Sequence, residues 1–402
     1  MISAEATSGF KGPEWIYQLP VDFYRQPQKI KAGFDPGRSF TAAVDLAIRT
    51  GLSTWMAGIS FPAGYFDHTL GKTLQGKRAS HCGNDDDIFH QPRPLPKFSI
   101  TQEKPPKGVE KGIFELIQWQ SVYQEPGNIS HRNNDRAQAL YWRHGGKPRP
   151  TIVLVHGFLA SWWEVNEFYL GAQFLYDMGC DLVLKTLPHH GPRSKKAKNV
   201  SGMDFVSKGI DSLNHAMVQS THDIRTLMDF LEFQGVDKIG MSGVSLGGYT
   251  TALMASLDDR LQFAIPVVPL ISLPDAMMEW KPLDMVIKAA MRIYGVNMHD
   301  LRATMALHSP LTRPPLLPSE RLLIIGGLGD QLATPRHAIK LQQHWGDCAL
   351  HWHSGAHALP RQQNQVNKAK AAFLQNIGFI NGDKYTAPVL KTDSLLAQVA
   401  TM

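Results

Sequence analysis

The segment Gly243-Val244-Ser245-Leu246-Gly247 decides the fold, because an apolar strand gives way to a helix there. The apolar run Ile239–Ser242 precedes it, and a helical stretch over Tyr249–Ser256 follows it. G-x-S-x-G between a strand and a helix is typical of a nucleophile elbow, a strained turn that lifts the serine hydroxyl out of the sheet. Gly243 and Gly247 carry no Cβ and so let neighbouring backbone come close. We predict Ser245 as the nucleophile; the alternative is a serine in a turn that only packs or binds phosphate.

Strand and helix patterns alternate on both sides of this segment. Short, continuous apolar runs are typical of strands buried on both faces of a parallel sheet; they are Thr151–Val155, Cys180–Leu184, Ile239–Ser242, Phe263–Val268, Leu322–Ile325 and Ala349–His353. Two further strands are expected over Ile113–Tyr123 and Ala137–Trp142. Helical stretches are Trp163–Met178, His215–Phe233, Tyr249–Ser256, Ala338–Trp345 and Gln362–Ile377. The alternation predicts an α/β fold with right-handed crossovers and a mainly parallel central sheet flanked by helices.

The compositional changes divide the chain into three parts. Residues 1–110 form an N-terminal extension of unassigned role, residues 111–380 the catalytic domain, and the polar residues 381–402 a tail. The extension contains one helix, about Phe40–Leu52, with Ser39 placed to cap it and an apolar stripe at Ala43, Leu46 and Ala47. The rest of the extension is rich in Gly, Pro and Asp and is interpreted as an irregular connection. It packs on the catalytic domain or shapes one wall of the pocket.

The buried run Thr151–Val155 ends in His156-Gly157-Phe158. Acyl transfer requires two backbone N–H groups aimed at the developing oxyanion. Leu246, which follows the nucleophile, offers one, and Phe158 is expected to offer the other. Gly157 allows close approach of this loop, and His156 is expected to orient the loop by hydrogen bonding. The alternative is an ordinary tight turn after a strand.

A serine hydroxyl needs a histidine base, and that histidine needs an acid to fix its tautomer. Where a serine elbow of this kind occurs, the chain order is Ser, then Asp or Glu, then His. Leu322–Ile325 leads into a glycine-rich loop that ends in Asp330, which is the expected acid; a turn or capping role is its competing interpretation. The next candidates for the acid are Asp275 and Asp347.

The expected base is His357, because it lies in a short loop between the last strand and the last helix. His351 and His353 fit less well, since they alternate on the strand itself and would be half-buried. Ser245, Asp330 and His357 together are a far more specific pattern than any one of them.

These motifs resemble the α/β-hydrolase superfamily, with its serine esterases, lipases and dienelactone hydrolases, over roughly residues 110–378. The resemblance implies a Ser-Asp-His triad at the carboxyl ends of the strands and neither a metal nor an organic cofactor. Thioesterases and serine peptidases share the fold, so the substrate does not follow from it. Ser245 stands where dehalogenases and epoxide hydrolases of this fold carry Asp, which favours an acyl-serine intermediate.

Composition and charge describe an ordinary globular chain. Its 402 residues are 43% hydrophobic and 19% charged, and the net charge is +6. There is no stripe of basic and aromatic residues, so no nucleic acid partner is expected. Cys82, Cys180 and Cys348 are too few and too far apart for a disulfide framework or a zinc site. No signal peptide is evident and the apolar stretch 52–65 is too short to span a bilayer. We expect a cytoplasmic protein with no stable membrane insertion.

Several features point to an apolar substrate. The segment Leu270–Pro318 stands where members of this superfamily often carry a cap, so a cap or lid is expected over about residues 270–320; it is rich in Met and aromatic residues. Phe158, Trp162 and Trp163 lie beside the oxyanion loop. An ester with an apolar acyl or aryl portion fits best. The alternatives are a peptidase or amidase, a thioesterase, and a noncatalytic binding protein on the same fold.

The loop Leu187–Arg193 has two weaker interpretations. Its paired histidines, His189 and His190, suggest a turn that shapes the pocket rim rather than a metal site, because no nearby acid or cysteine completes a ligand set. Arg193 is a candidate contact for a substrate carboxylate.

Overall fold

The computed structural model describes residues 33–60, 88–89, 94–109, 111–123, 133–160, 163–194, 201–206 and 209–380. Cys82, Trp162, residues 195–200 and the tail 381–402 lie outside the described residues.

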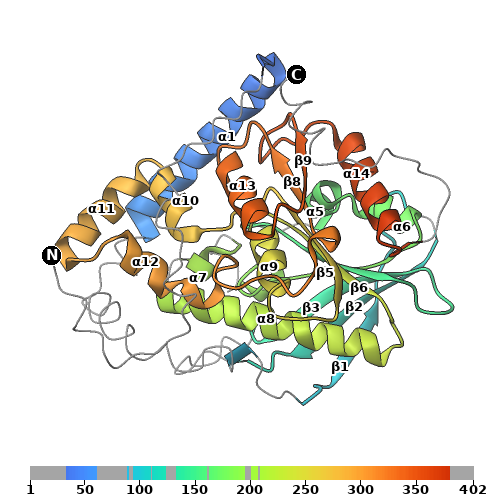
Figure 1. Ribbon diagram of the computed structural model, residues 1–402. Helices are drawn as coiled ribbons and strands as arrows, with labels where there is room; N and C mark the ends of the chain where they lie inside the picture. Colours follow the sequence, from blue (N-terminus) through green and yellow to red (C-terminus); the bar gives the residue numbers. More distant parts are fainter. Residues whose placement is uncertain are drawn as a thin grey trace.

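Nine strands form one sheet (Figure 1). They are β1 (Phe98–Gln102), β2 (Ile113–Gln120), β3 (Arg136–Arg143), β4 (Thr151–Val155), β5 (Asp181–Lys185), β6 (Ile239–Val244), β7 (Leu261–Val267), β8 (Leu323–Gly327) and β9 (Ala349–His353). The order across the sheet is β1-β2-β3-β5-β4-β6-β7-β8-β9. In this order, the pairs from β1–β2 to β3–β5 are antiparallel, and the pairs from β5–β4 to β8–β9 are parallel. The predicted α/β fold with a mainly parallel sheet is confirmed.

The central strands bring the predicted loops to one edge. β4 and β6 are buried along their whole length, which is why both appear in the sequence as continuous apolar runs. Their parallel register pairs Thr151 with Ile239 and Val155 with Gly243. The loop that begins at His156 and the turn at Ser245 therefore leave the sheet side by side, at the carboxyl ends of neighbouring strands.

Helices cover both faces of the sheet (Figure 1). They are α5 (Trp163–Leu170), α6 (Ala172–Asp177), α7 (Met203–Val206), α8 (Ile210–Phe233), α9 (Leu246–Met254), α13 (Pro335–His344) and α14 (Gln363–Asn376). One apolar core lies under α8, α9 and α13, and a second lies under α5, α6 and α14. Short turns of helix are η3 (Met56–Ser60), η4 (Gly191–Arg193), η5 (Ala306–His308) and η6 (Ser319–Arg321).

The single helix expected over 163–178 is two helices. Gly171 separates α5 from α6 and has φ of 68°, a left-handed conformation that suits glycine. A Cβ at Gly171 would stand 2.6 Å from Oδ1 of Asn367, so α14 packs directly on the break.

One strand was not expected. β1 lies in a segment that the sequence analysis treats as an irregular connection, yet it pairs antiparallel with β2 at the sheet edge. All of its residues after Phe98 are exposed, so it lacks the apolar run that identifies the inner strands. Phe98 secures it by packing against Trp119 and Phe230, with ring centroids 5.5 and 4.6 Å apart.

The N-terminal helix α1 (Pro36–Trp55) is longer than expected and is turned the other way. Its cap is Asp35 and not Ser39: the Asp35 carboxylate accepts from the backbone N–H groups of Gly37 and Arg38 at 2.9 and 3.2 Å. The expected apolar stripe at Ala43, Leu46 and Ala47 faces solvent. The buried face is polar instead and carries three residues: Thr41, Asp45 and Ser53. Apolar periodicity alone therefore assigned the wrong face to this helix.

Three helices between β7 and β8 stand over the same edge as α1. They are α10 (Leu273–Glu279), α11 (Leu283–Tyr294) and α12 (Met298–Thr304). Ser53 ties α1 to them, since its hydroxyl accepts from the N–H of Leu283 at 3.0 Å and donates to the carbonyl of Trp280 at 3.2 Å. Figure 1 shows α1, α10 and α11 grouped along one side of the molecule.

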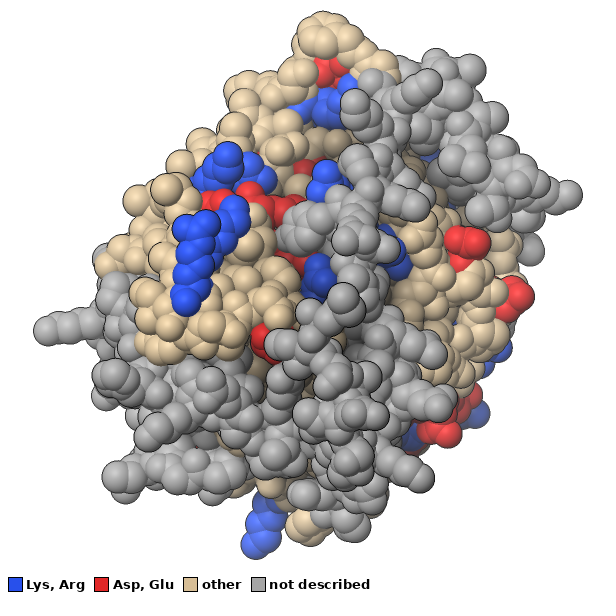
Figure 2. Space-filling model, turned by 60° about the vertical axis from the view of Figure 1, so that its left-hand side comes forward, with Lys and Arg blue, Asp and Glu red and all other residues tan. Residues whose placement is uncertain are grey.

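The surface on this side mixes charges of both signs. Among the coloured residues in Figure 2, Lys and Arg lie beside Asp and Glu rather than forming one continuous positive face. In the part of the chain that the structure describes, no helix combines the length and the apolar character needed to cross a membrane.

Candidate active site

Ser245 occupies a strained turn between β6 and α9. Its φ of 57° and ψ of −112° lie outside the regions that a side-chain-bearing residue normally adopts. Two hydrogen bonds hold the turn: the N–H of Ser245 donates to the carbonyl of Val267 at 2.9 Å, and its own carbonyl accepts from the N–H of Tyr249 at 2.9 Å. Because α9 begins at Leu246, the first N–H groups of that helix have no acceptor within it.

The two elbow glycines stand against backbone. A Cβ at Gly243 would be 2.2 Å from the carbonyl oxygen of Gly247, and a Cβ at Gly247 would be 2.2 Å from that of Val155. Neither carbonyl belongs to a flexible side chain that could move aside. Gly157 touches the serine from the other side, since a Cβ there would be 3.4 Å from Cβ of Ser245. The chain approaches the serine so closely that larger residues would force the elbow apart.

Asp330 and His357 meet although 27 positions separate them. Oδ2 of Asp330 lies 2.7 Å from Nδ1 of His357, and its Oδ1 accepts from the N–H groups of Leu332 and Ala333 at 2.8 Å each. The carboxylate thus fixes its own loop and the imidazole together, so the turn role and the partner role coexist. Burial alone would lower the pKa of His357, but the charges of Asp330 and Asp45 raise it above the usual value for histidine.

The other two acids considered lie elsewhere. Asp275 forms an ion pair with Arg302, at 2.6 Å, and a hydrogen bond with Ser272. Asp347 is exposed in the turn that precedes β9, at the opposite end of that strand from His357. Of the three candidates, Asp330 is the one that contacts the histidine.

His156 holds the loop after β4, in which Phe158 is the expected second oxyanion donor. Its Nδ1 lies 2.8 Å from the carbonyl of Gly157, and its Nε2 accepts from the N–H of Leu187 at 3.0 Å. Burial lowers the pKa of His156 to about 4, so the ring is neutral and can accept that bond. His156 thereby joins the loop after β4 to the loop after β5.

The loop after β5 packs against the loop after β4 through His190. His190 is fully buried and packs edge-on against Phe158 and Phe205, with ring centroids 5.9 and 5.5 Å apart. No cluster of three or more potential metal ligands occurs among the described residues.

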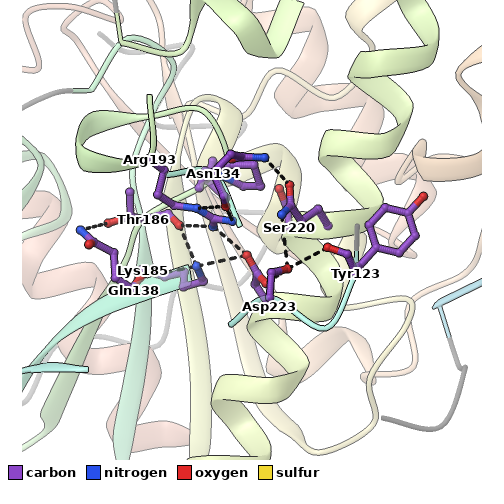
Figure 3. Close-up of polar contacts among 12 residues, drawn as sticks. Tyr123, Asn134, Gln138, Lys185, Thr186, Arg193, Ser220 and Asp223 are labelled. Atoms are coloured by element: carbon purple, nitrogen blue, oxygen red, sulfur yellow. Dashed lines mark hydrogen bonds and ion pairs between the residues drawn. The ribbon is translucent and has the colours of Figure 1, made fainter. Parts of the chain in front are cut away.

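A buried ion-pair network anchors the loop after β5 (Figure 3). The Arg193 guanidinium is 1% exposed and lies 2.7 Å from Oδ2 of Asp223 on α8; it also donates to the carbonyls of Asn134 and Thr186. Lys185, at the end of β5, lies 3.7 Å from the same carboxylate oxygen. The hypothesis that Arg193 contacts a substrate carboxylate is wrong, because its donors are bound inside the protein.

A cavity of about 350 Å³ opens at this edge of the sheet. Ser245, His357, Phe158 and Leu246 all line it. The other described lining residues come chiefly from α1, α7, the start of α8 and the helices after β7: Ile48, Leu52, Met56, Gly157, Leu159, Ala160, Tyr169, Phe205, Val206, Leu213, Val244, Leu270, Leu273, Ala276, Met277, Trp280, Leu283, Leu332 and Ala358. Of all these, only Ser245, Tyr169 and His357 carry a hydroxyl or an imidazole, and the other side chains are apolar.

Sequence reasoning missed one residue of the site. Asp45 on α1 accepts hydrogen bonds from the backbone N–H groups of His357 and Ala358, at 2.6 and 2.8 Å. The available signal was the spacing of polar residues on α1, since Asp45, Arg49 and Ser53 recur every four residues and share one helix face.

Comparisons with known proteins concern the family and the fold of the chain. Residues 161–288 match the family described as alpha/beta hydrolase domain containing 18. Over 306 residues the chain is 31% identical to the uncharacterized proteins MT2702 and Rv2627c of two Mycobacterium tuberculosis strains, covering 74% of this chain and 71% of each relative.

Similar solved structures include two acetyl xylan esterases. That of Thermoanaerobacterium sp. JW/SL YS485 is 15% identical with a TM-score of 0.51, covering 76% of this chain and 93% of that one. That of Paenibacillus sp. R4 is 14% identical with a TM-score of 0.51, covering 81% and 99%. At this identity the likeness concerns the fold. Together with the family match and the mycobacterial relatives, it establishes that the chain belongs to the α/β-hydrolase superfamily.

Proposed function

We propose that the protein is a serine hydrolase that cleaves carboxylic esters with an apolar acyl or aryl portion through an acyl-serine intermediate. One observation carries the proposal: Ser245 and His357 share a cavity whose other described lining side chains are almost all apolar. Its volume of about 350 Å³ lies within the roughly 300–1,000 Å³ usual for small-molecule sites.

In the first half of the reaction, Oγ of Ser245 attacks the ester carbonyl while Nε2 of His357 removes the hydroxyl proton. The oxygen of the tetrahedral intermediate receives hydrogen bonds from the backbone N–H groups of Phe158 and Leu246. Asp330 holds Nδ1 of His357 and stabilises the imidazolium. The intermediate then collapses, His357 returns its proton to the leaving alkoxide, and the alcohol departs.

In the second half, His357 removes a proton from water, which attacks the acyl carbonyl. The same two N–H groups stabilise the second tetrahedral intermediate. Ser245 leaves with the proton held by His357, and the carboxylic acid is released. The net reaction consumes one water and yields an alcohol and a carboxylic acid.

The lining also supports a preference among acyl groups. Moving a charged group from water into apolar surroundings is costly unless a partner compensates it. The described lining residues include no Lys, Arg, Asp or Glu. A neutral hydrocarbon chain or ring gains from burial there, at about 0.8 kcal/mol for each methylene removed from water.

Labelling with a fluorophosphonate tests the nucleophile. The wild-type protein should be labelled, and Ser245→Ala should not. Ser256→Ala is the matched control, because its buried hydroxyl caps the end of the same helix, bonding to the carbonyl of Leu253 at 2.7 Å. A folded wild type that takes no label, or a Ser245→Ala variant that still does, would contradict the proposal.

A series of nitrophenyl esters tests the substrate class. We expect kcat/KM to rise from acetyl toward longer chains, and to fall sharply for a succinyl ester, whose chain ends in a carboxylate. Equal turnover across the series would argue against an apolar acyl site. Turnover of amides or thioesters in preference to esters would move the assignment to a peptidase, amidase or thioesterase.

A further inference from the structure

The buried face of α1 is built to hold the loops of the active site. Asp45, Arg49 and Ser53 follow one another at intervals of four residues, so they form one stripe along the helix. Asp45 and Ser53 are 0% exposed. Arg49 donates to the carbonyl of Gln331 at 2.8 Å, and Ser53 bonds to the backbone of Trp280 and Leu283. The stripe therefore reaches the acid loop and the helices after β7.

Asp45 makes the most direct contact with the site. Its Oδ2 accepts from the N–H of His357 at 2.6 Å and from that of Gln331 at 3.1 Å, and its Oδ1 accepts from the N–H of Ala358 at 2.8 Å. Gln331 follows the expected acid and His357 is the expected base. One carboxylate thus bridges the two loops on which the pairing of acid and base depends.

The energetics favour a dedicated role. A buried carboxylate is costly unless hydrogen bonds compensate it, and bonds from N–H groups to a charged acceptor are about twice as strong as neutral ones. In the described part of the chain, the hydrogen-bond partners of Asp45 are these three backbone N–H groups. Breaking them would leave a buried charge and would remove one anchor from each of the two loops.

We propose that Asp45 is a positioning residue that sets the orientation of His357, and that α1 is a working part of the active site. The proposal rests on the proposed serine hydrolase function. Asp45 acts through the backbone of His357 and does not itself touch the substrate.

Four titratable groups lie near enough to His357 to interact with its charge. Asp330 and Asp45 are the acids, from the loop after β8 and from α1, and their charges raise its pKa. His337 on α13 and His353 on β9 are the other two; burial lowers their pKa values to about 3 and about 4, so both rings are neutral near pH 7. Removing the charge of Asp45 should therefore lower the pKa of His357.

The test measures the rate of fluorophosphonate labelling between about pH 5 and 9 for the wild type and Asp45→Asn. The asparagine keeps the shape, but it loses the charge and presents an NH₂ group to a backbone N–H. We expect the plateau rate to fall at least tenfold, since a hydrogen bond to a charged group carries about that much rate. The acid limb of the profile should move to lower pH by on the order of one unit.

Two variants on the same helix serve as controls. Asp35→Asn removes a charge that pairs with Arg361, at 2.8 Å, without touching the histidine loop's N–H groups, and should leave rate and profile unchanged. Ser53→Ala loosens the same buried stripe without changing charge, and should leave the acid limb in place. An Asp45→Asn protein that is folded and labels with the wild-type rate and profile would overturn the proposal.

A measurement independent of chemistry separates this proposal from the proposed function. The pKa of His357 is followed by NMR with ¹³C-labelled histidine, and the resonance is assigned with His357→Gln. If the wild type takes no label but the pKa of His357 still falls in Asp45→Asn, the hydrolase function fails and the positioning role stands. If labelling proceeds and the pKa does not move, the positioning role fails alone.

Discussion

At the scale of single residues, the choice of acid is the most testable consequence of the structure. Asp330→Asn should leave the protein folded and reduce the labelling rate on the order of 10⁴-fold, because the amide stabilises the wrong tautomer of His357. Asp275→Asn is the matched comparison: it breaks a buried contact with Arg302 but should keep the labelling rate. Labelling rates of both purified variants at pH 8 decide between the two acids. Loss of labelling in Asp275→Asn alone would reverse the assignment.

At this scale, the sequence predicts those features whose residues are contiguous along the chain. The elbow was readable because strand, turn, serine and glycines are contiguous. The sequence ranks Asp330 above Asp275 and Asp347 by its place after a buried strand, and the structure adds that Asp330 is the one of the three that contacts His357. The hypothesis that Arg193 binds a substrate carboxylate was wrong for a related reason, because its partner Asp223 lies 30 positions away on α8.

At the scale of elements, the helices after β7 set the depth of the cavity. Trp280, at the end of α10, lines the cavity and is held by a bond from its Nε1 to the carbonyl of Leu332 at 3.0 Å. Trp280→Ala should open space there and shift the best nitrophenyl ester toward a longer chain, as measured by kcat/KM across the series.

Trp345→Ala provides the control for this change. Trp345 is also buried but does not line the cavity, so its removal should cost a similar stability, about 3–5 kcal/mol, without moving the chain-length optimum. An equal shift in both variants would mean that the change reflects loosened packing and not the cavity wall.

The elements themselves were largely predictable, and the exceptions have physical causes. The inner strands carry continuous apolar runs because both faces are covered. The sequence pattern does not predict β1, because β1 is an exposed edge strand with one anchoring aromatic residue, Phe98. The face of α1 was assigned wrongly because that helix docks in part through hydrogen bonds from Asp45, Arg49 and Ser53, and hydrophobic periodicity does not report polar contacts.

At the scale of the whole molecule, buried ion pairs join the central sheet and its loops to a covering helix. The carboxylate of Asp223 on α8 forms ion pairs with Lys185 at the end of β5 and with Arg193 in the loop that follows (Figure 3). Asp223→Ala should lower the free energy of unfolding by about 3–5 kcal/mol, because it leaves the buried guanidinium of Arg193 without its counter-charge. Urea unfolding measures the loss. Asp229→Ala, which removes a partly exposed partner of Arg260, should cost about 1 kcal/mol or less; similar losses in both variants would contradict this ranking.

A second buried charge predicts a dependence on pH. Lys370 on α14 is fully buried, its Nζ donates to the carbonyl of Leu170 at 2.8 Å, and burial lowers its pKa to about 7. Between that value and the usual 10.5, the unfolded chain binds a proton that the folded chain does not, so this lysine disfavours folding most strongly below pH 7 and less as pH rises.

Lys370→Met should therefore raise the free energy of unfolding at pH 7 by roughly 1 kcal/mol or more, and the gain should shrink toward pH 10. Urea unfolding at the two pH values checks it. Lys368→Met, exposed on the same helix, should change little at either pH. A gain that stays constant with pH would show that the improvement comes from packing and not from the charge.

The sequence by itself determined the fold class, the elbow at Ser245 and the loops in which acid and base would lie. These features follow from short-range patterns: apolar runs, glycines beside a serine, and the order of motifs along the chain. Only the tertiary structure decided that Asp330 meets His357 and that Asp45, 312 positions before His357, holds its backbone. Such contacts depend on how β8, β9 and α1 come together at one edge of the sheet. The local sequence of any one of these segments does not specify which residues of the other two it will contact.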